Sequence, residues 1–176
     1  FYYPHGIHVS DGEVFVVDTY GHRVQVFKLD GTYKRKWGSY GTGNGQFYYP
    51  HGIHVSDGEV FVVDTYGHRV QVFKLDGTYK RKWGSQGTGD GQFDYPHDIH
   101  VSDGEVFVTD AKNYRVQVFE LDGTYKRKWG SRGSGNGQFY YPDGIHVSGG
   151  EVFVTDANNY RVQVFEILDI DNPGGT

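Results

Sequence analysis

Apolar and polar residues alternate with a period of two in four short segments of the first forty residues. The segment EVFVVD at residues 13–18 is the strongest, with β-branched and aromatic residues on both of its faces. Asp-Gly pairs at residues 11–12 and 30–31 are typical of tight hairpin turns. The pattern predicts a four-stranded antiparallel meander with strands at residues 6–10, 13–18, 23–28 and 32–37.

The same pattern then repeats with a period of 46 residues. The first two units differ only at Tyr40 against Gln86 and at Asn44 against Asp90. The fourth unit follows the third as far as Phe165 and then departs from the repeat. We therefore expect one domain over residues 1–176, built from units 1–46, 47–92, 93–138 and 139–176.

Neither face of these strands is polar, so a single unit cannot bury both of its faces. Val14 and Val16 would point to one side of the sheet, and Phe15 and Val17 to the other. Sheets of this kind are buried by stacking between copies of themselves, as in the blades of a propeller. The predicted fold class is all-β, with four propeller blades.

The motifs of each unit resemble the NHL repeat. The residues are GQF, then P-x-G-I-x-V, then EVFV-x-D, then RVQVF, and then LDGTYKRKWG, repeated in register as far as Phe165. The resemblance implies a β-propeller, usually six-bladed, with Ile and Val of the first strand at the hub and the Trp strand at the rim. Four blades leave three arrangements: a tight four-bladed ring, two chains in one eight-bladed ring, or part of a longer array.

The fourth unit also lacks the KRKWG segment. Either residues 167–170 form a degenerate fourth strand, or the last blade has three strands and an open edge that a partner could extend. This edge favours a homo-oligomer or polymer, and binding to another protein is an alternative.

Composition narrows the choice of partners. The net charge of −5 disfavours nucleic acid, although some NHL domains bind RNA and the segment Lys34-Arg35-Lys36 with its copies could form a basic band. No apolar run is long enough to predict a membrane span. The 27 glycines and the 17% aromatic content fit strands and turns. The sequence does not fix the localisation, and the cysteine-free, tyrosine-rich, repetitive chain favours an extracellular or cell-surface setting.

Histidines at repeated positions are the candidate metal ligands. In units 1 to 3 a histidine directly follows the proline of the first strand, and in unit 4 an aspartate has this position. These four side chains are expected to converge at the mouth of the central channel of the propeller: His5, His51, His97 and Asp143. Three imidazoles and a carboxylate suit a divalent transition metal, whereas copying by descent with a packing role is the alternative. A second set of histidines lies within the hub strand and is a candidate ligand or partner surface: His8, His54, His100 and His146.

Three other sets of residues recur. An Asp and an Arg five residues apart are expected to fix the turn between the second and third strands, and they are signature positions of the resembled family: Asp18 and Arg23, Asp64 and Arg69, Asp110 and Arg115, Asp156 and Arg161. The rim tryptophans are Trp37, Trp83 and Trp129. Tyrosines beside the prolines form a possible ligand or partner surface: Tyr3, Tyr49, Tyr95 and Tyr141.

Taken together, the sequence predicts a non-enzymatic scaffold for protein interaction or self-assembly. The alternatives are a propeller that binds RNA, a glycan or a peptide, and a metal-dependent, lyase-like enzyme that uses the hub histidines. No catalytic residue is predicted, because the repeated positions offer no set of different side chains in distinct roles.

Overall fold

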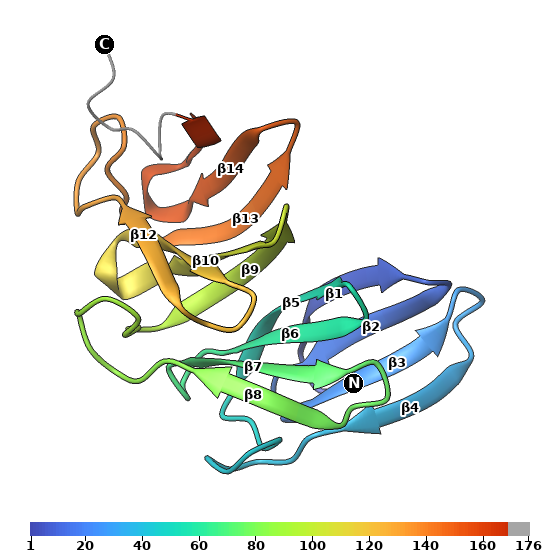
Figure 1. Ribbon diagram of the computed structural model, residues 1–176. Coiled ribbons are helices and arrows are strands. Elements are labelled where there is room, and N and C mark those ends of the chain that lie inside the picture. Colours follow the sequence, from blue (N-terminus) through green and yellow to red (C-terminus); the bar gives the residue numbers. More distant parts are fainter. Residues whose placement is uncertain (169–176) are drawn as a thin grey trace.

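The computed structural model describes residues 1–168, which form four antiparallel sheets, one in each unit (Figure 1). Strands follow chain order within every sheet, and the fourth sheet has three strands where the others have four. Blade 1 contains β1 (Pro4–Ser10), β2 (Glu13–Asp18), β3 (Arg23–Lys28) and β4 (Tyr33–Trp37), and blade 2 contains β5 (Pro50–Ser56), β6 (Glu59–Asp64), β7 (Arg69–Lys74) and β8 (Tyr79–Trp83). Blade 3 contains β9 (Pro96–Ser102), β10 (Glu105–Asp110), β11 (Arg115–Glu120) and β12 (Tyr125–Trp129), and blade 4 contains β13 (Pro142–Ser148), β14 (Glu151–Asp156) and β15 (Arg161–Glu166).

The all-β propeller prediction is confirmed. The second and third strands have the predicted bounds, whereas the first strand begins at the proline, two residues earlier than expected. An irregularity in the pairing of β1 with β2 lies between Pro4 and Ile7, and it recurs in the other blades. In blades 3 and 4, the connection between the second and third strands is a short 3-10 helix, at Ala111–Asn113 and Ala157–Asn159.

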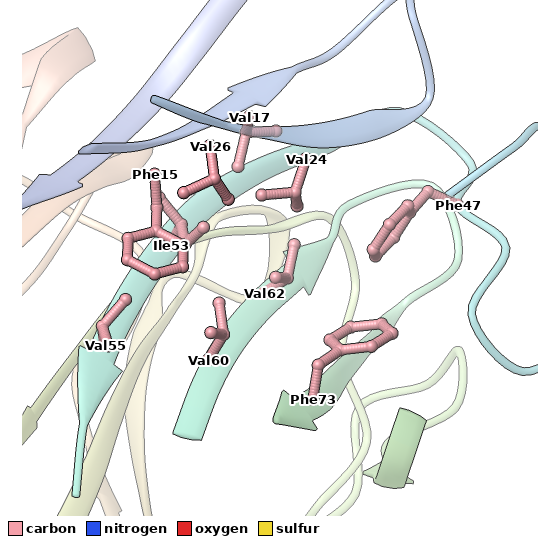
Figure 2. Close-up of a cluster of buried hydrophobic side chains, with 10 residues drawn as sticks. All are labelled: Phe15, Val17, Val24, Val26, Phe47, Ile53, Val55, Val60, Val62 and Phe73. Atoms are coloured by element: carbon pink, nitrogen blue, oxygen red, sulfur yellow. The ribbon is translucent and has the colours of Figure 1, made fainter. Parts of the chain in front are cut away.

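Successive blades are joined by apolar cores that lie between the sheets. In the first of these, Phe15 and Val24 of blade 1 face Ile53 and Val62 of blade 2 (Figure 2). Phe47, at the start of the second unit, closes the core against Phe73, with ring centroids 5.6 Å apart. Burial of apolar area on this scale is the dominant stabilising term between blades.

The four blades form an arc in which the hub strands β1, β5, β9 and β13 pack in sequence. The two ends of the arc remain apolar and exposed: Ile7 is 63% exposed at one end and Val162 is 59% exposed at the other. The described chain is therefore not the tight four-bladed ring that was one of the sequence-based alternatives.

The fourth blade is described as far as Leu168. Ile167 and Leu168 do not belong to a strand, and the remaining residues of the predicted degenerate strand, Asp169 and Ile170, lie outside the described residues. The open edge of blade 4 is thus β15 as far as the structure describes it. Residues 1–168 contain no helix with the length and apolar character needed to cross a bilayer.

Candidate functional site

In blades 2 to 4, the repeated Asp and Arg residues form corners, each around a buried carboxylate, that hold the segment crossing from the preceding blade. Arg69 Nε donates to Asp64 Oδ2 at 2.8 Å, and Tyr48 N donates to Asp64 Oδ1 at 2.6 Å. The other guanidinium nitrogens of Arg69 donate to the carbonyls of Thr42 and Gln46 at 2.6 and 2.8 Å. The guanidinium thus ties the crossing segment to the third strand of the following blade. Arg115 and Arg161 make the same kind of contacts.

The rim tryptophans pack across the joints between blades. The ring centroid of Trp37 lies 5.7 Å from that of Phe73, and Trp83 makes the same contact with Phe119. A Cβ built on Gly77 would come within 2.7 Å of the Trp37 ring, so the glycine of this turn leaves room for the indole. Trp129 packs against Phe165 of blade 4, with centroids 5.6 Å apart.

Two of the three basic residues in each rim strand are paired with a glutamate of the second strand. The Arg35 guanidinium donates to both carboxylate oxygens of Glu13, at 3.0 and 2.6 Å, and Lys34 also pairs with Glu13. The Arg35 hydrogen bonds hold the pKa of Glu13 at about 2. Arg81 pairs with Glu59 in the same way. Such neutralisation lowers the positive potential that nucleic acid binding requires.

The histidines within the hub strands form a ladder across all four blades. Neighbouring ring centroids lie 4.2 Å apart from His8 to His54, 4.3 Å from His54 to His100, and 4.5 Å from His100 to His146. Burial, reinforced by the neighbouring histidines, lowers the pKa of His54 to about 3 and that of His100 to about 4. The imidazoles of His54 and His100 are therefore neutral at pH 7.

The histidines that follow the prolines converge at the mouth of the hub. His51 Nδ1 and His97 Nε2 are 2.8 Å apart, and the ring of His5 stacks on His51 at 4.5 Å and 12°. His97 Nδ1 is paired with a carboxylate oxygen of Asp143 from blade 4. This mouth cluster, His5, His51, His97 and Asp143, brings together side chains of four blades, as the sequence pattern suggested.

A cavity of about 300 Å³ lies beside the mouth cluster and is bounded by blade 1 at one side and blade 4 at the other. Asp98 also lines it, and sequence reasoning did not identify this residue as part of a site. Its carboxylate accepts a hydrogen bond from Ile145 N at 3.0 Å, and burial raises its pKa. The available signal was that Asp98 stands where the other three units have glycine, at positions 6, 52 and 144.

The tyrosines beside the prolines join others to form a belt across the blades. Ring centroids are 5.2 Å apart from Tyr20 to Tyr49, 5.1 Å from Tyr49 to Tyr66, and 4.8 Å from Tyr66 to Tyr95. Tyr95 Oη donates to Tyr66 Oη at 2.8 Å. The backbone of Tyr49 has a φ of 56° and that of Tyr95 a φ of 62°, a left-handed conformation that is uncommon for tyrosine. Tyr3 and Tyr141 share it.

Two family models match the sequence. The NHL repeat matches residues 1–27 and 47–73, and a model described as a 6-bladed beta-propeller matches residues 92–170. No curated protein shows a match to the chain.

Solved structures show the same fold at low sequence identity. A catalytically inactive virginiamycin B lyase from Staphylococcus aureus with quinupristin has a TM-score of 0.67 and 18% identity, over 93% of this chain and 55% of that one. A chain of a nidogen/laminin complex has a TM-score of 0.74 and 20% identity, over 94% of this chain and 60% of that one. The computationally designed Ika4 protein has a TM-score of 0.64 and 17% identity, over 93% of this chain and 91% of that one. This chain thus spans less than two thirds of the first two proteins.

Proposed function

Because the chain belongs to the NHL-repeat β-propellers, we propose that it is a non-enzymatic assembly module whose two end faces bind further copies of the same chain. The observation that carries the proposal is that each end face consists of residues whose repeat equivalents form one half of a buried joint between blades. The occupant that fits such a face is another blade of the same repeat.

The first end face belongs to blade 1. Ile7 is 63% exposed and Val9 is 55% exposed, whereas their equivalents in blade 2, Ile53 and Val55, are each 5% exposed because blade 1 covers them. Leu29 of the same end is 68% exposed. The blade 1 face therefore has the same residues as the blade 2 face that blade 1 covers. Within residues 1–168, no blade covers the blade 1 face.

The second end face belongs to blade 4 and has the equivalents of the blade 1 residues that pack against blade 2. Val162 is 59% and Val164 is 50% exposed, whereas Val24 and Val26, their equivalents in blade 1, are fully buried against blade 2. The two end faces thus match by repetition in their first three strands, and the blade 4 face has no counterpart of Trp37. Their contact is heterologous, because one surface of the chain meets a different surface of the next copy.

Comparison with other propellers is compatible with this role. One similar structure was determined within a nidogen/laminin complex, where a propeller of this fold is part of a protein assembly. Exposed apolar patches on soluble proteins commonly mark such contacts.

The test is the absolute mass of the particle, by light scattering, for the native chain and for one variant at each end. Ile7→Lys blocks the blade 1 face and Val164→Lys blocks the blade 4 face, so each variant alone should be monomeric. An equimolar mixture of the two variants should form a dimer, because one unmodified face of each kind remains. A symmetric contact between two identical faces would not give a dimer that depends on mixing. Tyr40→Gln is the matched control, because Tyr40 is exposed in a crossing segment and blade 2 has glutamine at that position.

A native particle of two or more copies, together with mixing-dependent dimers of the variants, supports the proposal. A native chain that stays monomeric up to high concentration overturns it, as does a Tyr40→Gln variant that disassembles like the end-face variants.

A further inference from the structure

The mouth cluster contains the one group of three potential metal ligands found in the described part of the chain. One nitrogen from each of His5, His51 and His97 lies within 4.8 Å of the other two. These residues come from the hub strands of three different blades. We propose that the three imidazoles bind one divalent transition metal ion and that Asp143 holds His97 in position for it.

The distances are close to those that such an ion requires. Metal–nitrogen bonds of 2.0–2.1 Å in a tetrahedral site place ligand atoms about 3.3 Å apart. The His51 and His97 nitrogens, at 2.8 Å, are slightly closer than this, and the full set spans at most 4.8 Å. The separations therefore differ from that value by about 1.5 Å or less.

Asp143 acts on the site through His97. The Nε2 atom of His97 faces His51, and its Nδ1 atom is paired with Asp143 Oδ1. A carboxylate on the far nitrogen of a ligating histidine fixes its tautomer and the orientation of its ring. Asp143 is thus a positioning residue, and the three imidazoles are the ligands.

The surroundings favour binding of a cation. The adjacent cavity is lined by Asp98 and Asp143 and has a volume of about 300 Å³. A fourth coordination position open to this cavity would accept water or a small anionic or neutral ligand.

The hub ladder provides an internal comparison. His54 and His100 belong to the same strands as His51 and His97, and their rings also lie 4.3 Å apart. However, the ladder does not provide three ligand atoms as close together as those of the mouth cluster. Substitution in the ladder is therefore the matched control, because it removes a hub histidine and leaves the proposed ligands in place.

The experiment measures Zn²⁺ binding at pH 7 by calorimetry and by the zinc content that remains after desalting. The native chain should bind one ion per chain. His51→Gln and His97→Gln should lose this binding, Asp143→Asn should weaken it about 10- to 100-fold, and His54→Gln should bind like the native chain.

Far-ultraviolet circular dichroism and thermal unfolding without metal test whether each variant folds. The proposal is overturned if the native chain retains no zinc, or if His97→Gln or Asp143→Asn binds as tightly as the native chain. Loss of binding in His54→Gln at unchanged fold would also overturn it, because the ion would then lie in the ladder. If a ligand variant fails to fold, the isosteric Asp143→Asn variant decides the outcome. The mass of the particle plays no part in this test, so it is independent of the proposed assembly.

Discussion

Blades 1 and 2 have the same sequence at all but two positions, yet the same residues are in different environments in the two blades. Ile53 is 5% exposed and Ile7 is 63% exposed. A Cβ on Gly77 would collide with the Trp37 ring, whereas nothing lies within 4 Å of a Cβ on Gly31. The difference comes entirely from the neighbouring blade, which is present before blade 2 and absent before blade 1 among the described residues. Whether a residue such as Ile7 or Ile53 is buried therefore depends on the presence of a neighbouring blade and not on the sequence of its own unit.

The largest expected effect concerns the Arg corner. Arg69→Ala removes the partner of the buried Asp64 and three hydrogen bonds to carbonyls of the preceding crossing segment, so we expect a loss of about 3–5 kcal/mol in unfolding free energy. Arg23→Ala removes its bond to Asp18, and its side chain is 29% exposed, so about 1.5–3 kcal/mol is expected. Urea unfolding measures both. Equal losses of unfolding free energy in the two variants would show that the hydrogen bonds from Arg69 to the crossing segment do not stabilise the protein.

The second comparison concerns the hub isoleucines. Ile53→Ala should lower the unfolding free energy by about 2–5 kcal/mol, because it leaves a cavity in the joint between blades 1 and 2. Ile7→Ala should cost less than about 0.5 kcal/mol in the dilute monomer, because Ile7 is already hydrated. Thermal unfolding at low protein concentration distinguishes the two. A large loss in Ile7→Ala under these conditions would mean that the blade 1 face is covered in the monomer.

The smallest expected effect concerns pH and the hub ladder. The folded pKa of His54 is about 3, below the unfolded value of about 6.5, so the unfolded chain alone takes up a proton between these values and stability falls as pH falls from 6.5 toward 3. The titratable groups that face His54 are His8, His100 and His146, which disfavour its protonation further. We expect His54 to account for about 1–2 kcal/mol of lost stability at pH 5.

His54→Gln should reduce this dependence on pH, and His8→Gln should reduce it less, because His8 lies at the exposed end of the ladder and burial alone lowers its pKa. Urea titrations at pH 7, 6 and 5 measure the slopes. Identical slopes for the native chain and His54→Gln would contradict the burial of a neutral imidazole at this position.

The strands could be predicted from sequence because each alternates over a full element between clear turns. The segment EVFVVD predicts β2 with its observed bounds, and RVQVF predicts β3 as far as Lys28. The start of β1 at Pro4 was missed because the first residues pair irregularly, and a period of two does not describe an irregular pair.

The candidate site could be predicted only in part, since the repeat shows which positions are equivalent but not which atoms meet. The sequence places His97 and Asp143 at equivalent positions of adjacent units, but the pairing of Nδ1 with the carboxylate depends on the packing of β9 against β13. The left-handed backbone of Tyr95 has no sequence signal, because a residue before proline is ordinarily extended. Asp98 could be seen as a departure from the repeat but not as a site residue, because a single departure from glycine has no periodicity.

Each 46-residue unit has two faces that form joints. The face that includes Val24 in unit 1 packs against the following blade, and the face that includes Ile53 in unit 2 packs against the preceding blade. Copying one more unit into the gene would therefore add a complete joint and leave the same two apolar ends. Stability would then grow by a nearly constant increment with blade number, as in a one-dimensional array. The exposed apolar surface would stay constant until the last joint closes, so the length of such a protein can change through duplication without a new interface having to evolve.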